Sequence, residues 1–266
     1  MGGNEENNDN DNNNNNINTK FKIDWDKYID KAYILHLEYR KNRKIVTSDK
    51  LNQIETLTGS LLDKVTWWKG YYGETEWDEN IHVSKYSFLY HWTVDPNPKF
   101  RGKSKSHMES VTMNSSLSES NVSLGHASIL KDIVEKDIKV GLIMEDDILP
   151  APKFTETLDE IFKNELPADW DILYLSTQTN HGFKWTEHSE HLLKVSNGVW
   201  WFSGVVISQK AAQKLVKAFP IIGPVDVWIN HQFKDLDVYM CKKNIIHQNW
   251  SLGSDNEHSF YTKWGL

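Results

Sequence analysis

The sequence predicts an α/β fold, with a mixed and mostly parallel sheet and helices on both of its faces. Two observations predict it. Short apolar runs read as buried strands, and stretches with helical periodicity separate them. The chain has 266 residues, of which 39% are hydrophobic, including 12 Trp, 10 Tyr and 10 Phe. That content can fill a sizeable core, and we expect residues 21–266 to form a single domain.

In the first half of the chain, residues 32–37 are expected to form the first buried strand. A basic connection leads from it into a helix that reaches about Thr58. A second strand follows at residues 65–68. Residues 71–116 are rich in aromatic residues but lack clear periodicity, so we interpret them as a long excursion of the kind that carries specificity.

In the second half, Ser123 is expected to cap a helix that runs to Glu135. The apolar run that ends at Met144 reads as a strand, and residues 147–152 look like the start of a helix. The remaining helices are expected at 152–163, at 209–219 and from 225 onward. Further strands are expected at 170–175, at 198–208 (as one strand, or two broken by Gly204), at 238–240 and at 244–247.

The N-terminal segment has an unusual composition. Residues 4–18 are almost all Asn, Asp and Glu, so residues 1–20 are predicted to be a disordered tail.

Composition also bears on partners and location. A net charge of -7 and a pI of about 5.9 argue against a nucleic-acid partner. We find neither a signal peptide nor an apolar run that could span a membrane. With Cys241 as the one cysteine, this predicts a cytoplasmic, reducing location.

The most informative stretch is the acidic triplet Glu145, Asp146 and Asp147, directly after the apolar run. Ligands of α/β proteins bind at the carboxyl ends of strands, and adjacent carboxylates repel one another unless a positive charge is near. A hard divalent cation that also holds phosphate oxygens meets that need. The triplet therefore predicts a Mg²⁺- or Mn²⁺-dependent enzyme acting on a phosphate or diphosphate. The alternative is an acidic turn at the start of a helix.

Several segments between residues 32 and 255 follow the order of motifs in a known family. They are the opening strand with Arg43, Glu119 with His126, residues 142–147, residues 169–175, residues 204–215, Pro224 to Asp226, and His247 with Ser254 and Asp255. In these segments the chain resembles glycosyltransferase family 25, which includes lipooligosaccharide and collagen galactosyltransferases. It departs from the family pattern at His36 and Glu38, where the family has Asn and Asp.

The resemblance implies a GT-A-type, Rossmann-like nucleotide-sugar-binding fold. It also implies an inverting enzyme that moves a hexose, galactose or glucose, from a UDP-sugar to a glycan or a hydroxylated protein. The cofactor is then Mn²⁺ or Mg²⁺, because the leaving diphosphate needs a cation.

In that setting, Asp147 is the first expected metal ligand. Glu145 binds the metal through water or holds hydroxyls of the donor. Asp146 also belongs to the expected donor site, unless it points into the protein, since neighbouring side chains on an extended chain face opposite ways. His247 is the candidate third ligand, suited to Mn²⁺ more than to Mg²⁺, and His258 is its rival.

An inverting transfer needs a general base beside the acceptor hydroxyl. Asp226 is the first candidate, with helix capping as the alternative, and Asp255 is the second. Arg43 is expected to reach the diphosphate, or to be a solvated surface residue. His126 is expected to contact the donor, or to fix a helix end.

The aromatic residues Trp200, Trp201 and Trp228 are candidates for stacking on sugar rings, with core packing as the alternative. Two other functions compete with sugar transfer. One is a catalytically inactive relative that binds glycans, which the intact triplet disfavours. The other is a different metal-dependent phosphotransfer enzyme, which the absence of a P-loop motif disfavours.

Overall fold

The computed structural model describes residues 21–73, 88–89, 112–113, 116–221 and 223–254. The predicted tail, most of the excursion at 71–116, Asp255 and His258 therefore lie outside the described residues. No helix within the described part of the chain is long and apolar enough to cross a membrane.

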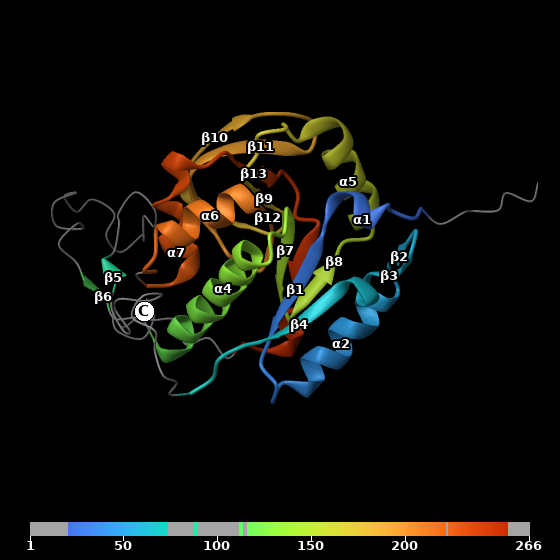
Figure 1. The fold of residues 1–266 in the computed structure, drawn as a ribbon, viewed down its shortest axis with the longest axis horizontal. Helices are drawn as coiled ribbons and strands as arrows, with labels where there is room; N and C mark the ends of the chain where they lie inside the picture. The colour runs from blue at the N-terminus through green and yellow to red at the C-terminus, as the bar shows by residue number, and fades with distance from the viewer. Residues whose placement is uncertain (1–20, 74–87, 90–111, 114–115, 222, 255–266) are drawn as a thin grey trace, which may run out of the picture.

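An eight-stranded sheet forms the centre of the fold (Figure 1). Its spatial order is β10 (Gln178–Glu187), β11 (Leu192–Trp200), β13 (Val238–Cys241), β9 (Ile172–Tyr174), β12 (Gly204–Ser208), β7 (Val140–Glu145), β1 (Lys31–His36) and β4 (Val65–Lys69). Strands β4, β1 and β7 pair in parallel, as do β9 and β13. Strand β12 runs antiparallel to both β7 and β9, and β10 and β11 add further antiparallel pairs.

The α/β class, the mixed sheet and the Rossmann-like arrangement are confirmed. Among the described strands of this sheet, however, three pairings are parallel and four are antiparallel, so parallel pairing does not predominate. The sequence conceals this detail because a strand buried on both faces reads as an apolar run whichever way it points.

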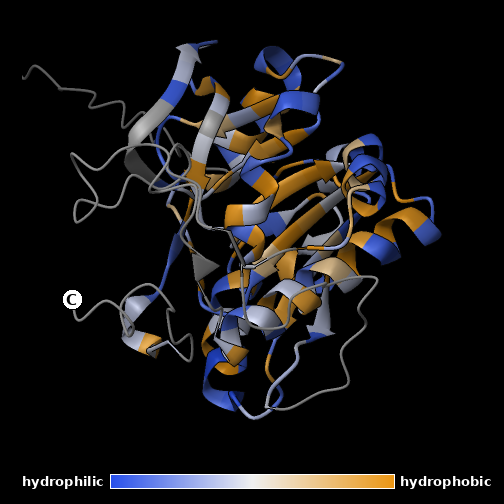
Figure 2. Ribbon diagram, turned by 90° about the vertical axis from the view of Figure 1, so that its left-hand side faces the viewer, coloured by the Kyte–Doolittle hydropathy of each residue, from blue (hydrophilic) through white to orange (hydrophobic). Residues whose placement is uncertain are grey.

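Helices cover both faces of the sheet, as predicted (Figure 1). One face carries α4 (Leu117–Glu135), α6 (Gln209–Lys217) and α7 (Val225–Asn230). The other carries α1 (Trp25–Tyr28), α2 (Lys41–Asn52) and α5 (Phe154–Glu160), which continues as the π-helical turn η3 (Ile161–Glu165). Figure 2 shows the apolar strands enclosed between these two layers.

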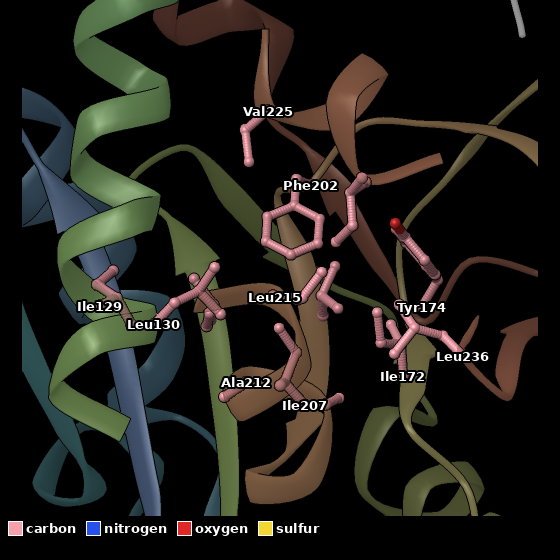
Figure 3. Close-up of a cluster of buried hydrophobic side chains, with 14 of the residues drawn as sticks. Ile129, Leu130, Ile172, Tyr174, Phe202, Ile207, Ala212, Leu215, Val225 and Leu236 are labelled. Atoms are coloured by element: carbon pink, nitrogen blue, oxygen red, sulfur yellow. The ribbon is translucent and has the colours of Figure 1, made fainter. Parts of the chain in front are cut away.

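Each face has its own apolar core. On the α4 face, Ile129 and Leu130 of α4 and Leu215 of α6 pack with Tyr174 and Phe202 (Figure 3). The central strands supply both cores by alternation, because successive side chains of a strand point to opposite faces. In β7, Ile143 belongs to the α4 core, whereas Leu142 and Met144 belong to the α2 core.

Several predicted boundaries are wrong, for local reasons. Helix α4 begins at Leu117 and not at Ser123, because Ser116 and Glu119 form a reciprocal capping box. The hydroxyl of Ser123 instead donates to the carbonyl oxygens of Glu119 and Gly223, each at 3.0 Å. Helix α2 ends at Asn52, because the chain then turns into the small hairpin of β2 (Glu55–Thr56) and β3 (Gly59–Ser60).

The expected helix start at 147–152 is also wrong. Residues Ile148–Pro150 form β8, which pairs antiparallel with β14 (Ile246–Gln248). The apolar segment 198–208 divides into β11 and β12, with residues 201–203 between them. The remaining described elements are β5 (Phe88–Leu89), β6 (Thr112–Met113), η1 (Leu61–Lys64), η4 (Phe233–Asp235) and η5 (Trp250–Leu252).

Candidate active site

Glu145, the last residue of β7, and Asp146, the first residue of the turn that follows, point to opposite faces of the sheet. Glu145 ends β7 on the α4 face, and its Oε1 lies 3.4 Å from Nε2 of His126. The His126 side chain is fully buried, and its ring packs edge-on against Phe202 at 5.0 Å. His126 therefore contacts Glu145, whose side chain is 25% exposed.

Asp146 lies on the opposite, α2 face, where it is 4% exposed. Its Oδ2 lies 2.8 Å from Nδ1 of His36, and its Oδ1 accepts a 2.7 Å hydrogen bond from Nη1 of Arg43. The Thr47 hydroxyl donates to its backbone carbonyl at 2.7 Å. Asp146 thus follows the interior alternative: it anchors the turn to β1 and α2, and both of its carboxylate oxygens are engaged. His36, where the chain departs from the family pattern, is one of these anchors.

Asp147 is the triplet member with the least compensated charge. Its Oδ2 lies 3.3 Å from Nη1 of Arg43, while its Oδ1 is buried with no hydrogen-bond partner among the described residues. Burial, and then the neighbouring charge of Glu145, raise the pKa of Asp147 to about 7, against a smaller opposing effect of Arg43. Asp147 is therefore a buried carboxylate whose charge the neighbouring residues only partly balance.

A C-terminal segment, Asn249 to Gly253, is fastened beside the triplet. The backbone amide of Asn249 donates to the carbonyl of Asp147 at 2.6 Å. Arg43 donates through Nη2 to the carbonyl of Gly253, and Arg40 donates to that of Leu252 at 3.2 Å. Arg43 is therefore not the solvated surface residue that was one of the two expectations for it. It is 8% exposed and joins Asp146, Asp147 and this segment.

Asp226 lies in the first turn of α7, on the α4 side of the sheet. Its carboxylate accepts hydrogen bonds from the backbone amides of Val227 at 2.9 Å and Trp201 at 3.4 Å. Burial raises its pKa, the charges of Glu119 and Glu145 raise it further, and the two amides oppose the shift. Glu119 of α4 and Glu145 of β7 are thus near enough to Asp226 for their charges to raise its pKa, and we call these three residues the acidic group.

The other predicted residues are dispersed. His247 lies exposed on β14, opposite Leu149 of β8. Within the residues that the structure describes, no three His, Cys, Asp or Glu side chains are grouped so as to hold a metal ion. Trp228 is 4% exposed and packs against Phe219, so it belongs to the core. The indole nitrogen of Trp200 is also buried, and has no hydrogen-bond partner among the described residues.

Two parts of the site were assigned no role from the sequence. Glu119 appeared only as a motif position, although its spacing from Ser116 marks a capping box. Trp250 is 70% exposed, and its ring lies 5.6 Å from that of Trp201. No periodicity or spacing in the sequence pointed to Trp250, because its position depends on contacts between distant segments.

A sequence profile described as glycosyltransferase family 25 (LPS biosynthesis protein) matches residues 29–229, which include the triplet, Arg43, His126 and Asp226. The chain belongs to glycosyltransferase family 25. The resemblance inferred from the motifs is thereby confirmed, and with it the class of glycosyltransferase. The family match stops before β13, so it does not reach His247 or Trp250.

Three curated relatives of this family 25 chain are named as procollagen glycosyltransferases or galactosyltransferases. Procollagen galactosyltransferase 2 of Homo sapiens is 28% identical over 113 residues, 40% of this chain and 18% of that protein. Procollagen galactosyltransferase 1-A of Xenopus laevis is 27% identical over 134 residues, 46% of this chain and 22% of that protein. Procollagen lysyl hydroxylase and glycosyltransferase of Acanthamoeba polyphaga mimivirus is 29% identical over 108 residues, 38% and 12% of the two chains. The matches span less than a quarter of each relative's length.

Replacing Arg43 with Met should destabilise the fold by about 3–5 kcal/mol, because it leaves the buried carboxylate of Asp146 without its cation and releases Gly253. Urea denaturation of the full chain measures this loss. Lys41→Met, at an exposed position two residues earlier in α2, is the control and should stay within about 0.5 kcal/mol of the parent. Equal stability of the two variants would show that Arg43 does not fasten the triplet.

Proposed function

We propose that the chain transfers a hexose, galactose or glucose, from a UDP-sugar to a hydroxyl of a glycan or hydroxylated protein, with inversion and with a divalent cation. Family membership and the relatives' names support hexosyl transfer, and the names favour galactose. The acidic triplet at the carboxyl end of β7 lies where ligands of open α/β sheets bind.

The main support for a bound cation is the carboxylate of Asp147 beside Glu145. One of its oxygens pairs with Arg43, and the other is buried without a hydrogen-bond partner among the described residues. Carboxylate oxygens are the ligands that Mg²⁺ and Mn²⁺ prefer, so Asp147 and Glu145 fit such an ion. When bound, the ion would neutralise charge that develops on the departing diphosphate. Phosphate oxygens of the donor would complete the set. His247, the third ligand that the resemblance suggests, lies exposed on the strand paired with β8 and is not grouped with these two carboxylates among the described residues.

The proposed base is Asp226. Its burial and the nearby Glu119 and Glu145 raise the pKa of this carboxyl, so its ionised form accepts a proton more readily than an ordinary aspartate. In the proposed step, the acceptor hydroxyl oxygen bonds to the anomeric carbon as the bond to the diphosphate breaks. Its proton passes to Asp226. The amides of Trp201 and Val227 orient the carboxylate for this role.

Calorimetric titration with UDP tests the cation. We expect binding in Mn²⁺ to be at least about tenfold tighter than in chelator, because a bound cation contributes several kcal/mol of charge stabilisation. The dependence should disappear in Asp147→Asn. It should persist in Asp169→Asn, an exposed carboxylate just before β9. The same affinity for UDP with Mn²⁺ and with chelator would refute the cation-dependent donor site.

A further inference from the structure

Two tryptophans, the half-buried Trp201 and the exposed Trp250, form an aromatic corner beside the acidic group. The rings of Trp201 and Trp250 have centroids 5.6 Å apart and are inclined by 60°. Trp250 is 70% exposed, so most of its ring surface is open to a ligand. We call these two side chains the indole corner.

The backbone holds both members in place. Trp201 has a φ of +70°, a left-handed conformation that is a genuine outlier for a bulky side chain and is retained where the surroundings impose it. Trp250 is the first residue of the turn η5. The residue before it, Asn249, donates its backbone amide to the carbonyl of Asp147. Arg40 and Arg43 hold the end of the same turn through the carbonyls of Leu252 and Gly253.

These attachments tie the indole corner to the two carboxylates of the proposed function. Trp201 donates its backbone amide to Asp226, the proposed base, and Trp250 follows the residue bonded to Asp147, the proposed cation ligand. A group resting on the corner would therefore lie next to the base. The acceptor must occupy that position, because its hydroxyl gives up a proton there.

We propose that the indole corner binds the acceptor, and that this acceptor is a saccharide whose ring packs on Trp250. The inference rests on the proposed function and specifies the substrate class of the same site. One face of a pyranose ring presents C–H groups that pack on an aromatic face, while its hydroxyls donate to carboxylates. Flat apolar area next to a few fixed acceptors is the pattern of a neutral, polyhydroxylated ligand.

Saturation-transfer NMR with the methyl β-glycosides of galactose, glucose and N-acetylglucosamine tests this directly, without donor or turnover. At least one glycoside should receive saturation from the full-length protein. The signal should fall about two- to tenfold in Trp250→Ala, the loss expected for one aromatic contact, and largely return in Trp250→Tyr, which keeps a flat ring. Trp185→Ala, at a 51% exposed tryptophan on β10, should leave it unchanged.

A kinetic arm gives an independent result. With a UDP-hexose as donor and the responding glycoside as acceptor, Trp250→Ala should raise the acceptor KM much more than it lowers kcat. Equal glycoside signals from parent and Trp250→Ala would overturn the proposal, as would transfer to a hydroxylysine peptide with no response to any glycoside. UDP binding by the unaltered protein separates these outcomes from failure of the proposed function.

Discussion

Changing Asp226 to Asn should lower the rate of sugar transfer by ~10²–10⁴, the usual contribution of a positioned general base. The substitution keeps the shape of the side chain and its hydrogen bond from the Val227 amide, so α7 should stay intact. It removes only the group that accepts the hydroxyl proton. Transfer to a saturating acceptor at saturating donor measures the loss, and UDP affinity should be retained.

The matched control is Asp235→Asn, which changes an exposed carboxylate in η4, the turn that follows α7. This control should transfer sugar at the rate of the parent. Near-parental transfer by Asp226→Asn would remove Asp226 as the base and move that role to Asp255, the second candidate.

Changing Asp147 to Asn should also cause a large loss of transfer but, unlike Asp226→Asn, should weaken donor binding as well. It should also make the protein more stable in chelator at about pH 8. The folded-state pKa of Asp147 is raised to about 7 from a normal value of 3.8. The stability linked to this group is thus fully present below about pH 4 and is lost as the pH rises through about 7.

The Asn variant has no charge to lose, so its melting temperature in chelator should exceed that of the parent by a margin that grows between about pH 4 and 7. Mn²⁺ should raise the melting temperature of the parent above about pH 7 and leave that of the variant unchanged, because binding to the native state stabilises it. If the melting temperatures of the two proteins in chelator changed in parallel with pH, Asp147 would not be an uncompensated charge.

The sequence was sufficient for the centre of the site, for a physical reason. A strand buried on both faces reads as an apolar run, so the end of β7 and the position of its three acids were predictable. Alternation along a strand also predicted that Asp146 could face away from Glu145, and it lies against His36 and Arg43 as that rule requires. Family motifs supplied Asp226, which no periodicity marks.

What could not be predicted depends on contacts between distant segments. Strand β10 was missed because its residues are polar or mixed, as suits the edge of a sheet that is not buried on both faces. The short β8 was taken for a helix start because its partner, β14, lies about a hundred residues later. The segment that carries Trp250 is held at the site by two hydrogen bonds. The Asn249 amide donates to the Asp147 carbonyl, and the Arg43 side chain donates to the Gly253 carbonyl, and neither bond leaves a signal in the local sequence.

Cation-dependent hexosyl transfer is tested most directly by a donor screen that reads UDP release with Mn²⁺ present. We expect release from UDP-galactose or UDP-glucose, suppressed by chelator and by Asp147→Asn and retained by Asp169→Asn. Release of UDP from neither donor by the folded protein, or release at the parental rate by Asp147→Asn, would contradict the proposed function.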